Sequence, residues 1–242
     1  RSIADTGADA VKFQTHIACE EGTAQEKFRV PIFPQDKTRQ DYWERTGFTE
    51  SQWQTLKEHA EKRGLVFLSS PFSIAAVRML RRLGVKAWKI GSGETNNLPL
   101  LEEISMGREP VFLSTGMSYL SEVDGAISLF KRSCSPILVM QCTNKYPCPP
   151  EYWGLNLIQH YRERFKVPVG FSDHSGNIAA GLAAVALGAE ALEVHVTWHK
   201  ACFGPDVKAS LTLEQLSVLI RGIRDLERAF QNPLEKDLFA EI

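Results

Sequence analysis

The sequence predicts an α/β fold of the (β/α)8 barrel class, and three observations support this prediction. Short apolar runs alternate strictly with helix-like segments along the 242 residues. Several runs are apolar at nearly every position, as in "PILVMQCT", which is typical of parallel strands covered on both faces. One strand–helix unit follows another every roughly 25–30 residues, and this near-constant repeat favours a barrel over the alternative, an open doubly wound sheet.

The individual elements follow from these runs in chain order. Seven strands are expected, at "DAVKFQT", "GLVFLSSP", "AWKIGSG", "PVFLSTG", "PILVMQCT", "VPVGFSD" and "ALEVHVT". Helices are expected at residues 50–63, 73–83, 121–131, 178–187 and 213–230, the first of them with Thr49 as its N-cap. Three glycines stand between a helix end and the next strand, which predicts C-cap positions at Gly64, Gly84 and Gly188.

Seven strands do not close an eight-stranded barrel. Residues 1–14, "RSIADTGADAVKFQ", have the pattern of a helix end that runs into a strand. We therefore expect the first strand of the barrel to lie upstream of Arg1. Residues 1–242 are expected to form a single barrel domain that is incomplete at its N-terminus.

One connection, residues 16–48, is much longer than the others. Connections of this length in compact domains are usually functional or disordered. Its aromatic residues argue against disorder, so we expect a covering flap or a partner-binding segment; they are Phe28, Phe33, Tyr42, Trp43 and Phe48.

The composition argues against several classes of protein. The chain carries 28 basic and 29 acidic side chains, and a formal net charge of -1 does not suit nucleic-acid binding. No apolar stretch approaches the roughly 18–20 residues needed to span a bilayer, so no membrane partner is expected. The five cysteines are scattered without a C-x-x-C pair, which predicts a reduced, cytoplasmic protein.

Polar side chains gather where the predicted strands end. In a (β/α)8 barrel this end of the strands carries the active site. The opposite ends of the strands show only ordinary Gly, Pro and Val. The strand tips offer hydroxyls, two lysines and two histidines, among them Lys12, Gln14, Ser69, Ser70, Lys89, Ser92, Glu94, Ser114, Thr115, Thr143, Asn144, Tyr146, Ser172, Asp173, His174, His195 and Thr197.

Two features of this set indicate chemistry. Lys89 lies within an apolar strand, where a lysine needs a counter-charge unless it reaches out between helices. Together with Lys12, small hydroxyls and the turns "GSG" and "STG", it suits a phosphate group. His174 and His195 end consecutive strands and are expected to be neighbours, so they are either structural or ligands of a divalent metal such as Mn²⁺, Zn²⁺ or Fe²⁺.

Several longer segments resemble the sialic acid synthase (N-acetylneuraminate synthase) family. They are "GADAVKFQT", "FLSSPF", "KIGSGETNNLPLL", "VFLSTGM", "QCTNKYPCPPE", "VPVGFSDHS", "AAVALGAEALEVHVT" and "FGPDVKASL", in the family's order over nearly the whole chain. The combination of "SDHS" with a following E-x-H-x-T is the most specific part. The resemblance implies a TIM barrel that condenses phosphoenolpyruvate with an open-chain N-acylhexosamine, typically N-acetylmannosamine, and releases phosphate.

The resemblance also implies roles for individual residues. The histidines of the "SDH" and E-x-H motifs, His174 and His195, would hold a divalent metal, Mn²⁺ or Mg²⁺. Glu94, Asp206 and Lys89 are the implied catalytic residues, the carboxylates orienting the sugar and water or moving a proton, and the lysine offsetting phosphate charge. The phosphoenolpyruvate site would comprise Lys12, Lys89, Ser92, Ser114, Asn144 and Ser172, and the sugar site Gln14, Glu94, Tyr146 and Asp206.

The chain departs from the family pattern at three points. The first-strand motif with its glutamate is not in the sequence, and "GPDV" stands where the family has "GPDH", so Val207 puts the standard sugar in doubt. Full-length members often add an antifreeze-like domain that reaches into a partner's active site. This chain ends without that domain, and a homodimer is expected for the full-length protein.

Three alternatives remain open at this point. A related synthase could make legionaminate or a spore-coat sugar acid by the same chemistry. A truncated barrel could bind a phosphorylated ligand without turning it over. An unrelated metal-dependent aldolase would need Lys89 as a Schiff-base lysine, but the hydroxyl-rich surroundings favour phosphate binding instead.

Overall fold

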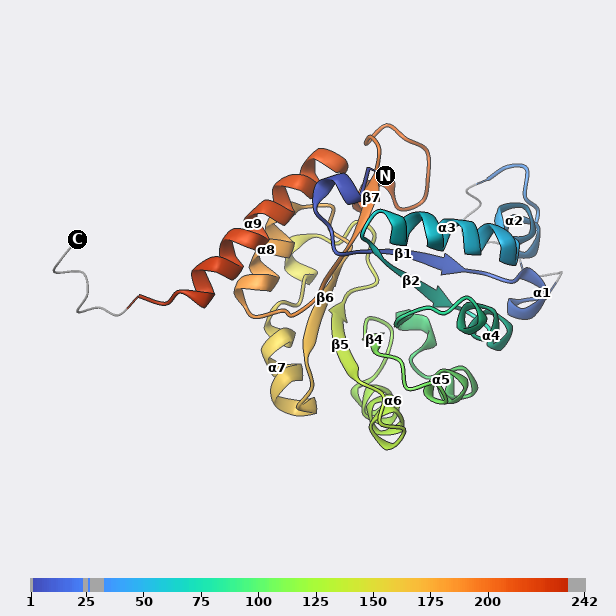
Figure 1. The fold of residues 1–242 in the computed structure, drawn as a ribbon, viewed down its shortest axis with the longest axis horizontal. Helices are drawn as coiled ribbons and strands as arrows, with labels where there is room; N and C mark the ends of the chain where they lie inside the picture. The colour runs from blue at the N-terminus through green and yellow to red at the C-terminus, as the bar shows by residue number, and fades with distance from the viewer. Residues whose placement is uncertain (1, 24–25, 27–32, 235–242) are drawn as a thin grey trace.

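Eight parallel strands form one curled sheet that carries its helices on the outer face (Figure 1). The computed structural model describes residues 2–23, 26 and 33–234. The strands pair in the order of the sequence, from β1 to β8, as expected for repeated right-handed strand–helix–strand units. Their bounds are β1 Ala10–Thr15, β2 Val66–Pro71, β3 Trp88–Ile90, β4 Val111–Ser114, β5 Ile137–Cys142, β6 Val169–Asp173, β7 Leu192–Thr197 and β8 Ser210–Thr212.

Helices connect the strands and cover the outer face of the sheet (Figure 1). The α-helices are α1 Ala18–Glu21, α2 Arg39–Thr46, α3 Glu50–Lys62, α4 Ile74–Arg82, α5 Leu98–Ser105, α6 Leu120–Arg132, α7 Asn156–Phe165, α8 Ile178–Ala186 and α9 Leu213–Gln231. Short 3-10 turns, η1 to η4, lie at Ala4–Thr6, Ser92–Glu94, Pro150–Tyr152 and Val207–Ala209. Among the described helices, none combines the length and apolar character that a bilayer span requires.

The seven predicted strands are confirmed, but the predicted count is one too low. β8 is the additional strand, and it pairs with β7 through Leu211 and Val196. Its sequence, Ser-Leu-Thr, contains a single apolar residue, so no apolar run marks this strand. No pairing between β8 and β1 is found in the described part of the chain, so the curled sheet is open along that side. A strand upstream of β1 stays a prediction.

The local signals at the helix ends are confirmed. Gly64, Gly84 and Gly188 have φ angles of 78°, 73° and 87°, the left-handed conformation in which glycine ends a helix. Thr49 caps α3, with its hydroxyl accepting from the Gln52 amide and the Gln52 side chain accepting from the Thr49 amide. The five predicted helices correspond to α3, α4, α6, α8 and α9, whereas α1, α2, α5 and α7 were not predicted.

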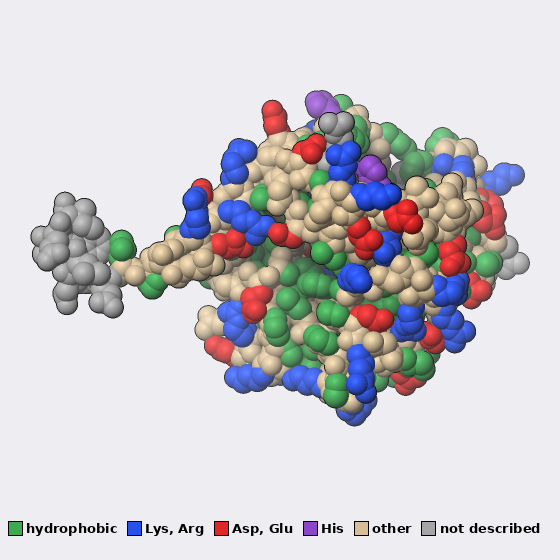
Figure 2. Space-filling model, viewed as in Figure 1, with side chains coloured by type: hydrophobic (Ala, Val, Ile, Leu, Met, Phe, Trp, Pro, Cys, Tyr) green, Lys and Arg blue, Asp and Glu red, His purple; other side chains and the backbone are tan. Residues whose placement is uncertain are grey.

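The core lies between the sheet and the helices that cover it. Trp88, Phe67 and Phe130 are among its largest fully buried side chains. Burial of apolar area of this kind is the main favourable contribution to folding. On the face shown in Figure 2, Lys and Arg side chains are interspersed with Asp and Glu, in keeping with the nearly balanced composition.

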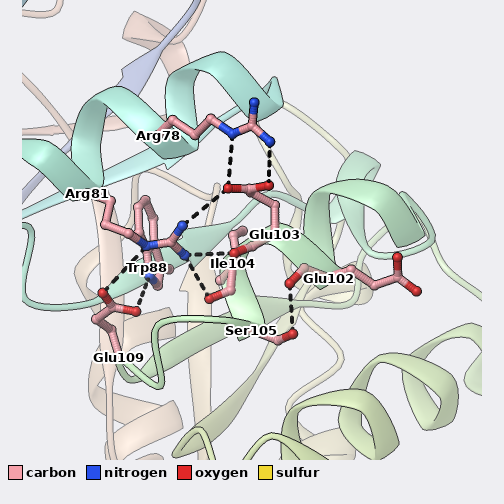
Figure 3. A network of polar contacts seen from close by, with 8 residues as sticks. All are labelled: Arg78, Arg81, Trp88, Glu102, Glu103, Ile104, Ser105 and Glu109. Atoms are coloured by element: carbon pink, nitrogen blue, oxygen red, sulfur yellow. Dashed lines mark hydrogen bonds and ion pairs between the residues drawn. The ribbon is translucent and has the colours of Figure 1, made fainter.

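A polar network joins α4 to α5 beside the start of β3 (Figure 3). The Glu103 carboxylate accepts two hydrogen bonds from Arg78, at 3.1 Å each, and one from Arg81 at 3.3 Å. Arg81 also lies over the Trp88 ring, and the Trp88 indole donates to Glu109 at 3.2 Å. Charge-assisted, bidentate bonds of this type are stronger than neutral ones, so the network ties two helices to the sheet.

The long connection after β1 is folded in the part that the structure describes. His16 stacks between Trp43 of α2 and Phe72, with ring centroids 4.8 and 4.2 Å apart. Phe33 stacks on Tyr42 and meets Phe203, in the β7–β8 connection, edge-on at 5.3 Å. These contacts lie at the carboxyl ends of the strands, where a covering flap was expected. Of the predicted aromatic residues, Phe28 lies outside the described residues, and Phe48 packs on Trp53 instead.

Candidate active site

Two lysines and a glutamate meet inside the strand-end face of the sheet. Lys12 Nζ lies 3.2 Å from Glu193 Oε1, and Lys89 Nζ lies 3.3 Å from Glu193 Oε2. Lys89 also donates to Ser114 Oγ at 2.7 Å. The residues come from β1, β7, β3 and β4, and the inward alternation of strand side chains brings them together.

Glu193 is the counter-charge that the buried lysine required. Lys89 is only 4% exposed, and this burial lowers its pKa, while the nearby Glu193 carboxylate opposes the shift. Burial alone would raise the pKa of Glu193, but the ammonium groups of Lys89 and Lys12 lower it to about 2. The Glu193 carboxylate is therefore ionised at neutral pH.

Sequence reasoning missed Glu193 as a site residue, although a signal for it was present. In "LEVHVT" the residues at i and i+2 share one face of the strand, so Glu193 points the same way as His195. The expectation that Lys89 needs a counter-charge predicted that a carboxylate lies nearby, but it did not predict which residue supplies that carboxylate.

The two histidines lie together, as predicted, with ring centroids 5.3 Å apart. His174 Nδ1 lies 2.7 Å from the Thr143 carbonyl oxygen, so this nitrogen carries the ring proton and donates it. His174 Nε2 then accepts from the Tyr146 hydroxyl at 2.9 Å, and the two rings stack. Burial lowers the pKa of His174 to about 4, which leaves the imidazole neutral at pH 7.

His195 has a similar arrangement with a different oxygen. Its Nδ1 lies 3.4 Å from Asp206 Oδ2, and burial lowers the pKa of the His195 imidazole although Asp206 opposes this shift. Beside the ring is an open cavity of about 350 Å³. Its lining comes from the end of β7 and the β7–β8 connection, and includes His195, Trp198, Phe203, Asp206 and Val207.

Ser172 connects the lysine pair to the histidine pair. Its Oγ lies 3.5 Å from Glu193 Oε1 and 3.5 Å from His174 Nε2, both at the long limit of a hydrogen bond. The lysines and the imidazoles are therefore joined in one continuous set of contacts rather than two separate ones.

The donor set of the two histidines suits a divalent cation. In each ring Nδ1 faces an oxygen acceptor, the Thr143 carbonyl or the Asp206 carboxylate, which is the arrangement that orients Nε2 as a metal ligand. Within the residues that the structure describes, no group of three or more His, Cys, Asp and Glu side chains is placed to hold a metal. If a metal is bound here, the two histidines could supply two of its ligands, and water or substrate oxygens would supply the rest.

The remaining predicted site residues lie at the same end of the strands but outside this chain of contacts. Glu94 is the last residue of η2, and its carboxylate accepts a hydrogen bond from the Asn97 side-chain amide at 2.8 Å. Asp173 ends β6 and turns to Ser175, accepting from its amide and its hydroxyl. Gln14 lies within β1, one residue before its end, while Ser92 follows β3 and Asn144 follows β5. Among the described residues, the side chains of these three join none of the contacts above.

In the two turns predicted to bind phosphate, only one glycine, Gly116, is required by the close approach of another part of the chain. Gly116, in "STG", donates from its amide to Cys142 Sγ at 3.1 Å. A Cβ at this position would lie 2.6 Å from Cys142 Sγ and 3.1 Å from the Cys142 carbonyl oxygen. Gly93, in "GSG", has no neighbour within 4 Å of such a Cβ, so space does not require glycine there.

The chain matches the NeuB family over residues 1–235. The chain belongs to the NeuB family. It is 36% identical over 239 residues to the N,N'-diacetyllegionaminic acid synthase of Campylobacter jejuni, covering 96% of this chain and 72% of the relative. It is 34% identical to the human N-acetylneuraminate-9-phosphate synthase, covering 100% of this chain and 68% of that protein.

A solved structure has the same architecture. The N-acetylneuraminic acid (sialic acid) synthetase of Leptospira borgpetersenii, crystallised with citrate, superposes with a TM-score of 0.86 at 28% identity, over 99% of this chain and 81% of that one. The resemblance stated from the sequence is thus confirmed, as is the prediction of an enzyme, because these NeuB-family relatives are named as synthases of sugar acids.

Proposed function

We propose that this NeuB-family chain condenses phosphoenolpyruvate with an open-chain N-acylhexosamine resembling N-acetylmannosamine. The products are a nonulosonic acid and inorganic phosphate. The observation that carries the proposal is the continuous site in which Lys12 and Lys89 lie beside two neutral imidazoles. Point charges for a phosphate thus stand next to ligands for a metal, which is what this reaction needs.

The phosphate end of the substrate would bind at the lysines. Glu193 contacts Lys12, Lys89 and Ser172 in the described structure, and Ser114 accepts a hydrogen bond from Lys89. Ser92 and Asn144, at neighbouring strand ends, complete the proposed phosphoenolpyruvate site. The two ammonium groups would offset the charge of the phosphate both on binding and as it departs.

The sugar would occupy the cavity beside His195. Asp206 and Tyr146 lie next to the imidazoles, and Gln14 and Glu94 come from β1 and η2 at the same end of the sheet. Burial raises the pKa of Tyr146, so its hydroxyl keeps its proton and serves as a hydrogen-bond donor. Mn²⁺ or Mg²⁺, when bound by His174 and His195, would supply a Lewis acid that polarises the sugar aldehyde.

The bond changes assign a task to each protein group. A bond forms between C3 of phosphoenolpyruvate and the aldehyde carbon, and the aldehyde oxygen takes up the electron pair and a proton. Water adds to C2, and the tetrahedral intermediate expels phosphate to leave a ketone. Asp206 and Glu94 would orient the sugar hydroxyls and the water and accept a proton, while Lys89 offsets the charge of the leaving phosphate.

A second sugar is favoured by one comparison. The Campylobacter jejuni relative is named as an N,N'-diacetyllegionaminic acid synthase, and Val207 lines the sugar cavity here. A diacetamido hexose is therefore the alternative to N-acetylmannosamine as the acceptor. The condensation with phosphoenolpyruvate would be the same.

A phosphate-release assay tests the proposal. The chain is incubated with phosphoenolpyruvate and Mn²⁺, with and without each N-acylhexosamine, and inorganic phosphate is measured. We expect phosphate release only when a sugar is present, together with a nonulosonic acid of matching mass. Release that does not depend on sugar would contradict the proposal, and absence of release with every sugar would favour a barrel that binds ligand without turnover.

A further inference from the structure

Glu193 is a charged group of the candidate site to which the proposed reaction gives no role. Its two carboxylate oxygens face different lysines, Oε1 toward Lys12 at 3.2 Å and Oε2 toward Lys89 at 3.3 Å. The lysines come from β1 and β3, whereas Glu193 comes from β7. One carboxylate therefore fixes the relative position of two ammonium groups from separate strands of the curled sheet.

We infer that Glu193 is a positioning residue for the phosphate end of phosphoenolpyruvate, acting through Lys12 and Lys89. Its two oxygens hold both ammonium groups directed at one point. This inference rests on the proposed function, because it takes the two lysines as the phosphate-binding groups.

The hydrogen-bond capacity of the lysines is compatible with this role. Each ammonium group has three N–H donors. Lys89 directs one to Ser114 Oγ and one toward Glu193, and Lys12 directs one toward Glu193. Both lysines thus keep donors for an incoming anion, and Glu193 does not have to leave when the phosphate binds.

The burial of Lys89 explains why a carboxylate is needed. Its side chain is almost completely removed from water, and a buried ammonium group without a counter-charge is strongly disfavoured. A lysine that has lost its proton, or that has turned away, no longer offers a point charge to a phosphate. Glu193 supplies the missing charge before the substrate arrives.

A metal-ligand role for Glu193 is the competing explanation. Glu193 lies two residues before His195 on the same face of β7, so its carboxylate is close to the proposed metal site. Both of its oxygens, however, are engaged by lysines, and among the described residues it forms no three-ligand group with the histidines. Metal content is therefore a readout that separates the two roles.

The decisive experiment compares Glu193→Gln, which keeps the size of the side chain and removes its charge, with the wild-type chain. Calorimetry should give a dissociation constant for phosphoenolpyruvate that is higher by about tenfold or more in the variant. KM for phosphoenolpyruvate should rise similarly and kcat should change less, while Mn²⁺ uptake is retained. Unchanged or tighter binding would overturn the inference, and so would loss of Mn²⁺.

A double-mutant cycle tests whether Glu193 acts through a lysine. If it acts through Lys12, the affinity lost in Lys12→Met/Glu193→Gln is smaller than the product of the two single losses. Independent, multiplicative losses would contradict the inference. If circular dichroism shows that Glu193→Gln does not fold, Glu193→Asp replaces it. The shorter aspartate keeps the charge but cannot reach both lysines. Wild-type affinity for phosphoenolpyruvate in Glu193→Asp would also contradict the inference.

The same measurements separate this inference from the proposed function. A wild-type chain that binds neither phosphoenolpyruvate nor inorganic phosphate would overturn the proposed function and the role of Glu193 with it. A wild-type chain that binds phosphoenolpyruvate, with equal affinity in Glu193→Gln, would overturn the role of Glu193 alone.

Discussion

The hydroxyl of Tyr146 lies 2.9 Å from His174 Nε2, and the two rings stack with centroids 4.1 Å apart. His174 Nδ1 is already bonded to the Thr143 carbonyl, so Nε2 presents its lone pair and the tyrosine donates. In the proposed function Tyr146 is one of the sugar-site residues, and its hydroxyl is the donor that it would offer to a sugar oxygen.

Tyr146→Phe should therefore weaken sugar binding without affecting phosphoenolpyruvate. Loss of one neutral hydrogen bond predicts a KM for the N-acylhexosamine that is higher by about three- to tenfold, with KM for phosphoenolpyruvate unchanged. Steady-state kinetics with each substrate varied in turn measures both constants. Tyr152→Phe is the matched control, because Tyr152 is exposed and its ring contacts Lys145 rather than the site. An equal rise in both KM values would contradict the assignment.

His174→Ala and His195→Ala should each remove Mn²⁺ binding. In the proposed site these two histidines are the protein ligands found among the described residues, so loss of either should lower Mn²⁺ affinity by at least about tenfold, the smallest effect expected even for a supporting residue. Electron paramagnetic resonance of free Mn²⁺ measures this without any turnover. His160→Ala, on the exposed side of α7, should bind Mn²⁺ as the wild-type chain does. Full Mn²⁺ affinity in either site variant would remove the metal role.

The sequence predicted the fold correctly where the residue type alone indicates the local backbone conformation. Apolar runs gave seven strands, and Gly64, Gly84 and Gly188 marked helix ends, because glycine is the residue that adopts a positive φ at low cost. β8 was missed because its sequence, Ser-Leu-Thr, contains a single apolar residue and therefore forms no apolar run.

The candidate site was predicted less completely than the fold. Strand-end position identified Lys12, Lys89 and the two histidines, which the structure brings together. It could not show where a side chain turns: Asp173 folds back to Ser175 and Glu94 bonds Asn97, whereas Glu193 points inward to the lysines. Such choices are made by hydrogen-bond partners that lie on other elements, or in the next turn of the chain.

The Glu103 network predicts an acid-dependent loss of stability. Hydrogen bonds from Arg78 lower the pKa of Glu103, although its burial opposes this shift, so the folded state binds a proton less readily than the unfolded chain. The stabilisation is complete above the unfolded pKa of about 4.3 and is lost as the pH falls through the lower folded pKa. Glu103→Gln should therefore lower Tm at pH 7, and the difference from the wild-type chain should shrink near pH 3.

The neighbouring Glu102 provides the control for this prediction. It lies on the same helix, but its carboxylate points away from the arginines in Figure 3. Glu102→Gln should leave Tm nearly unchanged at both pH values, as expected for an exposed side chain. Equal Tm losses in the two variants, or a Glu103→Gln deficit that grows in acid, would contradict the role of the network.

Gly116→Ala should disturb the phosphate end of the site through packing alone. The added methyl group would meet Cys142 Sγ and the Cys142 backbone, and the backbone of β5 cannot move aside as a flexible side chain would. Overpacking of this kind costs about 1–3 kcal/mol, and it should shift Ser114 away from Lys89 and raise KM for phosphoenolpyruvate. Gly93→Ala, which adds the same methyl group into open space, is the matched control. Urea unfolding measures the loss of stability, and steady-state kinetics measures KM for phosphoenolpyruvate. Equal stability and equal KM in the two variants would show that the contact between Gly116 and Cys142 of β5 does not shape the site.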